Sequence, residues 1–193
     1  LYECDCDIDS IAEKILPIAV EEKVEFRQLL EIDFHWLCRC LRILNYGPYY
    51  TTNNIFCPSC DQVSHGEYQV DLRSIEVKPL PAGFINEITV SKDEFLDFDG
   101  DIVLKLPTIQ DMINAEKDKL FQNAEGVTNR ELARMCYMIK SIKGKTSLTP
   151  ADIKLTLQNV MTSADFFILK DVVVRLTDYG LRAGGSTVCP KCH

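Results

Sequence analysis

The 193-residue chain lacks several features that mark common classes of protein. It contains no uninterrupted run of the roughly 20 apolar residues that a membrane span needs, and Leu1 begins no signal-like segment. It contains no run of Lys and Arg, and its net charge of −8 opposes binding that depends on contacts to phosphates. The sequence therefore predicts a protein whose partners are neither membranes nor nucleic acids.

The chain also lacks the short motifs of common enzymes. It has no Gly-rich phosphate loop and no nucleophile with a paired base. Residues 97–101 (Asp-Phe-Asp-Gly-Asp) resemble part of a calcium-binding loop. When the segment is aligned on such a loop, however, the residues at two ligand positions do not fit. With Gly100 at the sixth position, the first ligand would be Phe95 and the twelfth Leu106, and neither side chain binds calcium. We read this run as a turn between two strands, and we predict that the protein is not an enzyme.

The composition is that of a globular protein, with 46% apolar and 26% charged residues. Residues 1–22 are acidic and are predicted to form an N-terminal appendage. Residues 23–193 are predicted to form one α+β domain, with short antiparallel strands over residues 49–106 and helices over residues 108–180. Because the chain begins with Leu1 and not with Met, we expect further residues upstream.

Local signals place individual elements within this domain. Alternating apolar residues predict a strand over residues 23–28. A helix is predicted over residues 32–44, because the Gly and Pro that follow it end helices. The last helix is predicted to stop before Gly180, which supplies a left-handed residue. Later helix starts are indicated by Thr108, Thr128 with Glu131, Thr149 before Pro150, and Ser163 or Ala164.

Nine cysteines are many for a chain of this length. Because nine is an odd number, one thiol would stay unpaired if all the others formed disulfides. Cys57 and Cys60 form one Cys-Pro-x-Cys motif, and Cys189 and Cys192 form a second. Each motif is a tight turn whose two thiolates converge, and four thiolates complete a closed tetrahedral zinc site. The sequence therefore predicts one structural zinc ion, Zn2+, that these four cysteines bind and that clasps the two ends of the domain.

Other interpretations of the cysteines stay open. The same four thiolates suit a rubredoxin-like iron site, or they belong to two separate turns with free thiols. A catalytic zinc would need an open position, which requires that His193 replace a cysteine. A second site would combine Cys4 and Cys6 with Cys38 and Cys40, although Cys-x-Cys pairs are poor zinc knuckles.

A short repeat precedes the two motifs. Residues 42–47 (Arg-Ile-Leu-Asn-Tyr-Gly) come before the first motif, and residues 175–180 (Arg-Leu-Thr-Asp-Tyr-Gly) come before the second. An Asp followed by Phe stands upstream of each copy, at Asp33 and at Asp165. The repeat predicts two similar units, each consisting of a helix, a loop and a cysteine knuckle.

One of these units lies in a segment that resembles a known family. Residues 31–42, together with Tyr46, Gly47 and the loop to Cys57, resemble a hallmark stretch of the T4-type bacteriophage baseplate hub proteins, which include the hub-assembly protein. Members of this family pair an aromatic helix containing Asp, and an Arg, with a loop that leads to a cysteine.

Two further segments extend the resemblance over about residues 15–125. Residues 70–77 are similar to the family's strand after the cysteine region, and residues 102–108 to its later step from a strand through proline into a helix. The second motif and the acidic N-terminus fall outside the resemblance. The most specific matching positions are Asp33, Arg42, Cys57, Asp71 and Pro107.

The resemblance implies a structural or assembly component of the hub region of a contractile phage tail baseplate. Such a protein would be made in the host cytoplasm, become part of the virion and act in a hetero-oligomeric assembly through contacts with other baseplate or tail proteins. The residues by themselves leave two other classes open. One is a zinc-ribbon adaptor that binds nucleic acid, and the other is a rubredoxin-like iron protein that transfers electrons.

Overall fold

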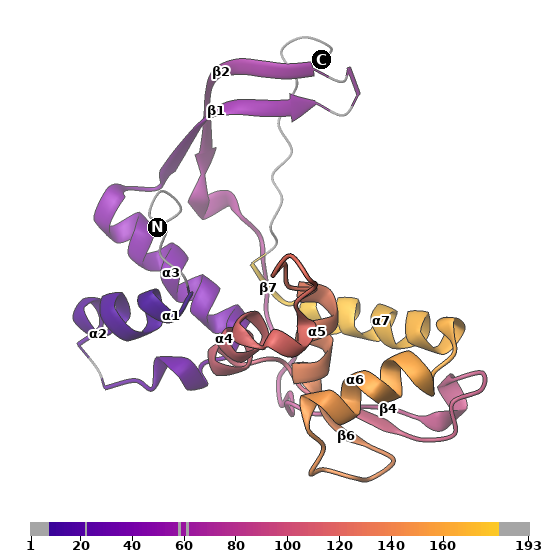
Figure 1. The fold of residues 1–193 in the computed structure, drawn as a ribbon. Helices are drawn as coiled ribbons and strands as arrows, with labels where there is room; N and C mark the ends of the chain where they lie inside the picture. The colour runs from indigo at the N-terminus through magenta and orange to yellow at the C-terminus, as the bar shows by residue number, and fades with distance from the viewer. Residues whose placement is uncertain (1–7, 22, 58, 61, 182–193) are drawn as a thin grey trace.

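The computed structural model describes residues 8–21, 23–57, 59–60 and 62–181 (Figure 1). Helices and short antiparallel strands make up the fold, which confirms the predicted α+β class. In chain order the elements are α1 (Ile8–Ser10), η1 (Ile11–Ile15), α2 (Leu16–Ala19), η2 (Phe26–Gln28), α3 (Glu31–Tyr46), β1 (Tyr49–Cys57), β2 (Gln62–Asp71), η3 (Leu72–Ser74), β3 (Val77–Lys78), β4 (Ile88–Val90), η4 (Lys92–Glu94), β5 (Ile102–Leu104), α4 (Ile109–Lys117), η5 (Lys119–Phe121), α5 (Arg130–Met138), β6 (Ile139–Ile142), α6 (Pro150–Asn159), α7 (Ser163–Thr177) and β7 (Gly180–Leu181).

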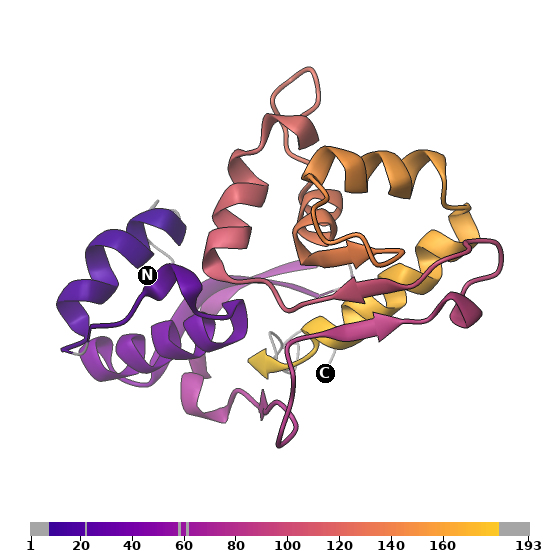
Figure 2. The same ribbon diagram turned by 90° about the horizontal axis from the view of Figure 1, so that it is seen from below.

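The main core lies where the sheet β4–β5–β6 meets the helices α5, α6 and α7 (Figure 2). β5 is the central strand and runs antiparallel to both neighbours. Ile102 and Leu104 of this strand are fully buried, as are Met138 of α5 and Leu169 of α7. Because each such side chain contributes about 1.5–3 kcal/mol when it leaves water, this cluster is the largest source of stability in the described residues.

A second apolar cluster joins the N-terminal helices to α3 and α4. Ile11 and Leu16 are buried in it together with Phe34 of α3 and Ile109 of α4. Arg27 adds polar contacts, because its guanidinium pairs with two carboxylates of the N-terminal helices and donates to a side chain of α4. Residues 8–19 therefore pack against α3 and α4. The boundary between appendage and domain at residue 22 stays a prediction.

The strand predicted over residues 23–28 is wrong. The chain forms the short 3-10 helix η2 there, and Phe26 inserts into the second cluster. Val24, the other apolar residue of the supposed strand face, is half-buried and packs at the edge of the same cluster. Two apolar residues in alternation are also compatible with a single helical turn that buries one aromatic ring. Here the packing of Phe26 determines the local structure.

Capping threonines begin two helices where the sequence predicts them. The hydroxyls of Thr108 and Thr149 accept the main-chain N–H of the Asp three residues later, and the carboxylate of that Asp accepts the main-chain N–H of the threonine. For α5 the predicted cap is wrong by one residue, because Asn129 caps the helix instead of Thr128. Thr128 forms an isolated β-bridge with Gln122 and so precedes the helix.

β1 and β2 form an antiparallel hairpin that projects away from the two clusters (Figure 1). The register runs from Tyr49 opposite Asp71 at the base to Cys57 opposite Gln62 at the tip. Within the described residues, neither strand pairs with any other strand. The hairpin is therefore an arm, and its base is attached to the C-terminal end of α3.

The strands β3 and β7 pair at the foot of this arm, with Val77 opposite Leu181. Gly180 has a φ of +89°, and a Cβ atom at this residue would lie 2.9 Å from the Cβ of Ile32 in α3. Only glycine combines this backbone conformation with so close an approach. The end of α7 is thereby packed directly against the beginning of α3.

The predicted repeat is visible where α3 and α7 end, and it is not visible where they begin. Gly47 has a φ of +80° and Gly180 one of +89°, and each glycine leads the chain from a helix into a strand. At the helix starts, however, Asp33 is exposed whereas Asp165 is fully buried. The two copies therefore share the way their helices terminate but differ in their tertiary contacts.

Candidate metal centre

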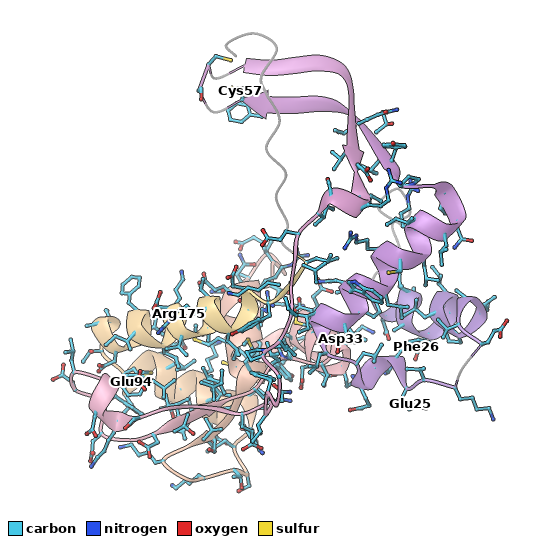
Figure 3. All side chains as sticks on the ribbon, turned by 180° about the vertical axis from the view of Figure 1, so that it is seen from behind. Glu25, Phe26, Asp33, Cys57, Glu94 and Arg175 are labelled. Atoms are coloured by element: carbon cyan, nitrogen blue, oxygen red, sulfur yellow. The ribbon has the colours of Figure 1, made fainter. Side chains whose placement is uncertain are left out.

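Two of the four predicted zinc ligands lie at the tip of the β1–β2 hairpin. Cys57 is the last residue of β1, and Cys60 lies in the turn before β2. Figure 3 shows Cys57 at the end of the arm that is farthest from α3. A tight turn at the end of two paired strands is the geometry that brings both sulfurs of a Cys-Pro-x-Cys knuckle to one side.

The thiol of Cys57 is shielded from solvent, although a two-stranded hairpin leaves both of its faces open. Cys57 is only 8% exposed, whereas its neighbour Phe56 is 58% exposed. Cys60 is half-buried. Cysteine is among the residue types most often buried, so its shielding is ordinary, whereas the exposure of Phe56 beside it is not. A shielded thiol is compatible with a closed structural zinc site.

The described residues supply one half of the donor set. Cys189 and Cys192, the other two predicted ligands, lie outside the described residues, as does His193. Among the side chains that the structure describes, no three His, Cys, Asp or Glu groups gather as metal ligands. The two thiolates at the hairpin tip fit half of a tetrahedral S4 set, which is the set that structural zinc takes.

Two of the remaining described cysteines lie in apolar surroundings. Cys136 is buried in the main core, and burial raises the pKa of its thiol to about 12. Cys38 packs against the second cluster, and burial raises its pKa to about 11. Metals bind the thiolate, which these surroundings disfavour. Cys40 is half-buried on α3, and Cys4 and Cys6, its partners in the alternative second site, lie outside the described residues.

Two arginines of α3 attach the arm to the body. Arg39 donates from Nε to the main-chain carbonyl of Leu72 at 2.7 Å and from NH2 to that of Arg73 at 3.2 Å. Arg42 donates to the carbonyls of Gly47 at 3.2 Å and Tyr49 at 3.4 Å. The resemblance points to Arg42 but not to Arg39. The signal available for it was the spacing of three, which places two arginines on one helix face.

None of the helices in the described part of the chain has the length and apolar character that a bilayer span requires.

Comparison with known proteins finds no relative of this chain. No protein-family model, no curated protein and no solved structure matches the chain.

Proposed function

We propose that this chain is a structural or assembly component of the hub region of a contractile phage tail baseplate, and that it acts through contacts with other proteins. The observation that carries the proposal is that α3 and the start of β1 expose four large apolar side chains. Leu44 is 80% exposed and Tyr46 is 74% exposed, and Trp36 and Tyr49 also face solvent.

These side chains have the composition of a protein-binding surface. Tyr and Trp are enriched in interfaces because they bury a large area and lose little conformational entropy. Single exposed apolar residues are common on any surface, but here they follow one helix and the strand that leaves it. The same segment, residues 31–57, carries the resemblance to the baseplate hub family. Surface chemistry and resemblance therefore support the same function.

We further infer that a structural zinc ion is bound by Cys57, Cys60, Cys189 and Cys192. An isolated two-stranded hairpin is at best marginally stable in water, and β1 and β2 form such a hairpin. Structural zinc stabilises the folded state directly, because the assembled ligand set exists only in the folded chain. The metal would fix the tip of the arm, while Arg39 and Arg42 fix its base.

Elemental analysis of the purified protein tests the metal. We expect one equivalent of zinc per chain, and we expect Cys57→Ser to lose it while Cys136→Ser keeps it. Visible charge-transfer absorbance would reveal iron in place of zinc. Less than half an equivalent of any metal, with the native thiols freely titratable, would contradict the site.

Recovery of partners from phage-infected cells tests the function. An affinity-tagged chain should recover other tail proteins, and tails assembled without the protein should lack a complete baseplate. Trp36→Ala and Tyr46→Ala should reduce this recovery, whereas Val160→Ala, also exposed but at the C-cap of α6, should not. Normal baseplates in its absence, with nucleic acid recovered as the partner, would instead favour the zinc-ribbon adaptor, which a mobility-shift assay across salt concentrations would measure.

A further inference from the structure

The base of the arm carries a cluster of cations and aromatic rings, which we name the arginine–tyrosine patch. It consists of Arg39, Arg42 and Tyr46 on α3, Tyr49 at the start of β1, and Arg73 in η3. The guanidinium carbon of Arg42 lies 4.9 Å from the centre of the Tyr46 ring, and that of Arg73 lies 5.6 Å from the centre of the Tyr49 ring. Each stacked pair presents a positive charge beside an exposed ring.

The positive charge of this patch is balanced only in part, because one carboxylate lies beside its three arginines. That carboxylate belongs to Asp71, which pairs with Arg73. Arg39 and Arg42 donate to main-chain carbonyls instead, and within the described residues neither lies in an ion pair. Every other described arginine pairs with a carboxylate, namely Arg27, Arg130, Arg134 and Arg175. The patch is therefore a locally basic surface on a chain whose net charge is −8.

A loop of the opposite charge lies between β4 and β5. Residues 91–101, which we name the acidic loop, contain five exposed carboxylates: Asp93, Glu94, Asp97, Asp99 and Asp101. Leu96 stands among them with 72% of its surface exposed. The loop thus presents an apolar tip surrounded by negative charge.

The acidic loop is held in one conformation. Phe95 and Phe98 on either side of Leu96 are buried. Their rings pack edge to face, with 5.4 Å between the ring centres. The buried carboxylate of Asp165 accepts the main-chain N–H groups of Leu96 and Asp97. A surface that is fixed before binding loses little conformational entropy when a partner covers it.

The two surfaces lie too far apart to meet within one molecule. Figure 3 shows Glu94 of the acidic loop at the end of the molecule opposite α3 and the arm. Complementary surfaces at different ends of one chain produce a head-to-tail contact between copies, which extends or closes into a ring.

We propose that the arginine–tyrosine patch of one molecule binds the acidic loop of a second copy of this chain. The carboxylates of the loop face Arg39 and Arg42, and Leu96 packs against the rings of Tyr46 and Tyr49. Nucleic acid is the less favoured occupant, because its binding needs many more cations than the three of the patch. This self-association goes beyond the baseplate function and does not depend on it.

Sedimentation velocity over a range of concentrations measures the association directly. The full native chain is used at about 0.15 M salt, where a screening length of about 8 Å suppresses repulsion between two acidic copies. We expect a concentration-dependent species larger than the monomer. Arg42→Glu and Asp97→Lys should each weaken this association by about tenfold or more, because each places like charges together at the interface.

A matched variant controls for net charge. Arg175→Glu makes the same change of charge as Arg42→Glu, but on α7, where Arg175 pairs with Asp171. It should leave the association unchanged. Since Arg42 also holds the base of the arm, circular dichroism checks that Arg42→Glu is folded. Asp97→Lys tests the same interface through an exposed side chain of the loop.

Mixing the two variants tests whether the patch of one copy binds the loop of another. Arg42→Glu keeps a native loop and Asp97→Lys keeps a native patch, so the mixture should regain a complex that neither variant forms alone. A native chain that is monomeric at all concentrations would overturn the proposal. Equal weakening by Arg175→Glu, or no complex in the mixture, would overturn it as well.

Discussion

The carboxylate of Asp165 accepts a hydrogen bond from the main-chain N–H of Leu96 at 2.6 Å, although 69 residues separate the two. Asp165 is fully buried at the third position of α7. There it also accepts the hydroxyl of Thr162, the residue that caps the helix. One side chain therefore completes a helix start and holds a distant loop.

Asp165→Asn should destabilise the protein more than Asp152→Asn does. Both residues follow a capping Thr by three positions, but only Asp165 also accepts N–H groups of the loop. An Asn amide would place N–H donors against the donors of Thr162 and the loop. We expect the melting temperature of Asp165→Asn to fall by roughly 2–4 °C or more, as expected for the loss of one net hydrogen bond in a chain of this size. Equal melting temperatures for the two variants would contradict the role of the loop bonds.

The contribution of Asp165 should depend on pH in one direction. Burial alone would raise the pKa of its carboxyl, but hydrogen bonds from Leu96, Thr162 and Asp97 outweigh burial, and the pKa lies below its ordinary value of 3.8. A carboxyl with a lowered folded pKa stabilises the protein above its unfolded pKa, and that stability is lost as pH falls through the folded pKa. Denaturant unfolding should therefore show a difference between native protein and Asp165→Asn at neutral pH that shrinks below pH 3.8. A difference that grows in acid would contradict this prediction.

Gly180→Ala should cost more than Gly47→Ala. Both glycines have positive φ, and Gly47 combines it with an extended ψ of 172°, so both substitutions carry a backbone cost of about 1–3 kcal/mol. At Gly47 a Cβ meets nothing within 4 Å, whereas at Gly180 it meets the Cβ of Ile32 at 2.9 Å. Equilibrium unfolding of the two variants should show an additional loss at Gly180 of about 1–3 kcal/mol, the usual cost of overpacking. Equal losses of unfolding free energy in the two variants would contradict this prediction. They would mean that α3 moves away from the added methyl group without cost.

Removal of one zinc ligand should affect stability more than removal of a core thiol. Cys57→Ser and Cys189→Ser should each lower the free energy of unfolding by several kcal/mol, because a structural metal stabilises only the folded chain. Cys136→Ser should cost about 1 kcal/mol, since its buried thiol only packs in the core. Chelation of the metal should remove the difference between native protein and Cys57→Ser. Identical melting curves for Cys57→Ser and Cys136→Ser would contradict the metal site.

Local chemistry explains which elements the sequence predicted well. Thr108 and Thr149 begin helices because a hydroxyl, a following Asp and a free helix start satisfy one another without help from the rest of the fold. The turn at residues 97–101 and the left-handed Gly180 were predicted for the same reason. Cys57 and Cys60 lie at the tip of the hairpin, and the zinc site expected there stays a prediction.

Elements that depend on distant contacts were harder to locate. β1 lies within the range predicted to contain strands, but its polar run Thr-Thr-Asn-Asn has no alternation that would give its bounds, and its conformation depends on pairing with β2. Other such elements were missed. β6 follows α5 without a helix-breaking residue, and it becomes a strand because Ile142 and Ser141 pair with β5. The buried role of Asp165 was missed in the same way, because its partners lie 68 and 69 residues away.

The pairing of β3 with β7 has a consequence for synthesis on the ribosome. The ion pair between Lys78 and Asp178 beside these strands spans 100 residues of chain. At a translation rate of about 5–20 residues per second, β3 leaves the exit tunnel roughly 5–20 s before its partner does. During this interval the main-chain groups of β3 have only water or a chaperone to bind. Among the described elements β7 is therefore made last, and it pairs with a strand that was synthesised about 100 residues earlier.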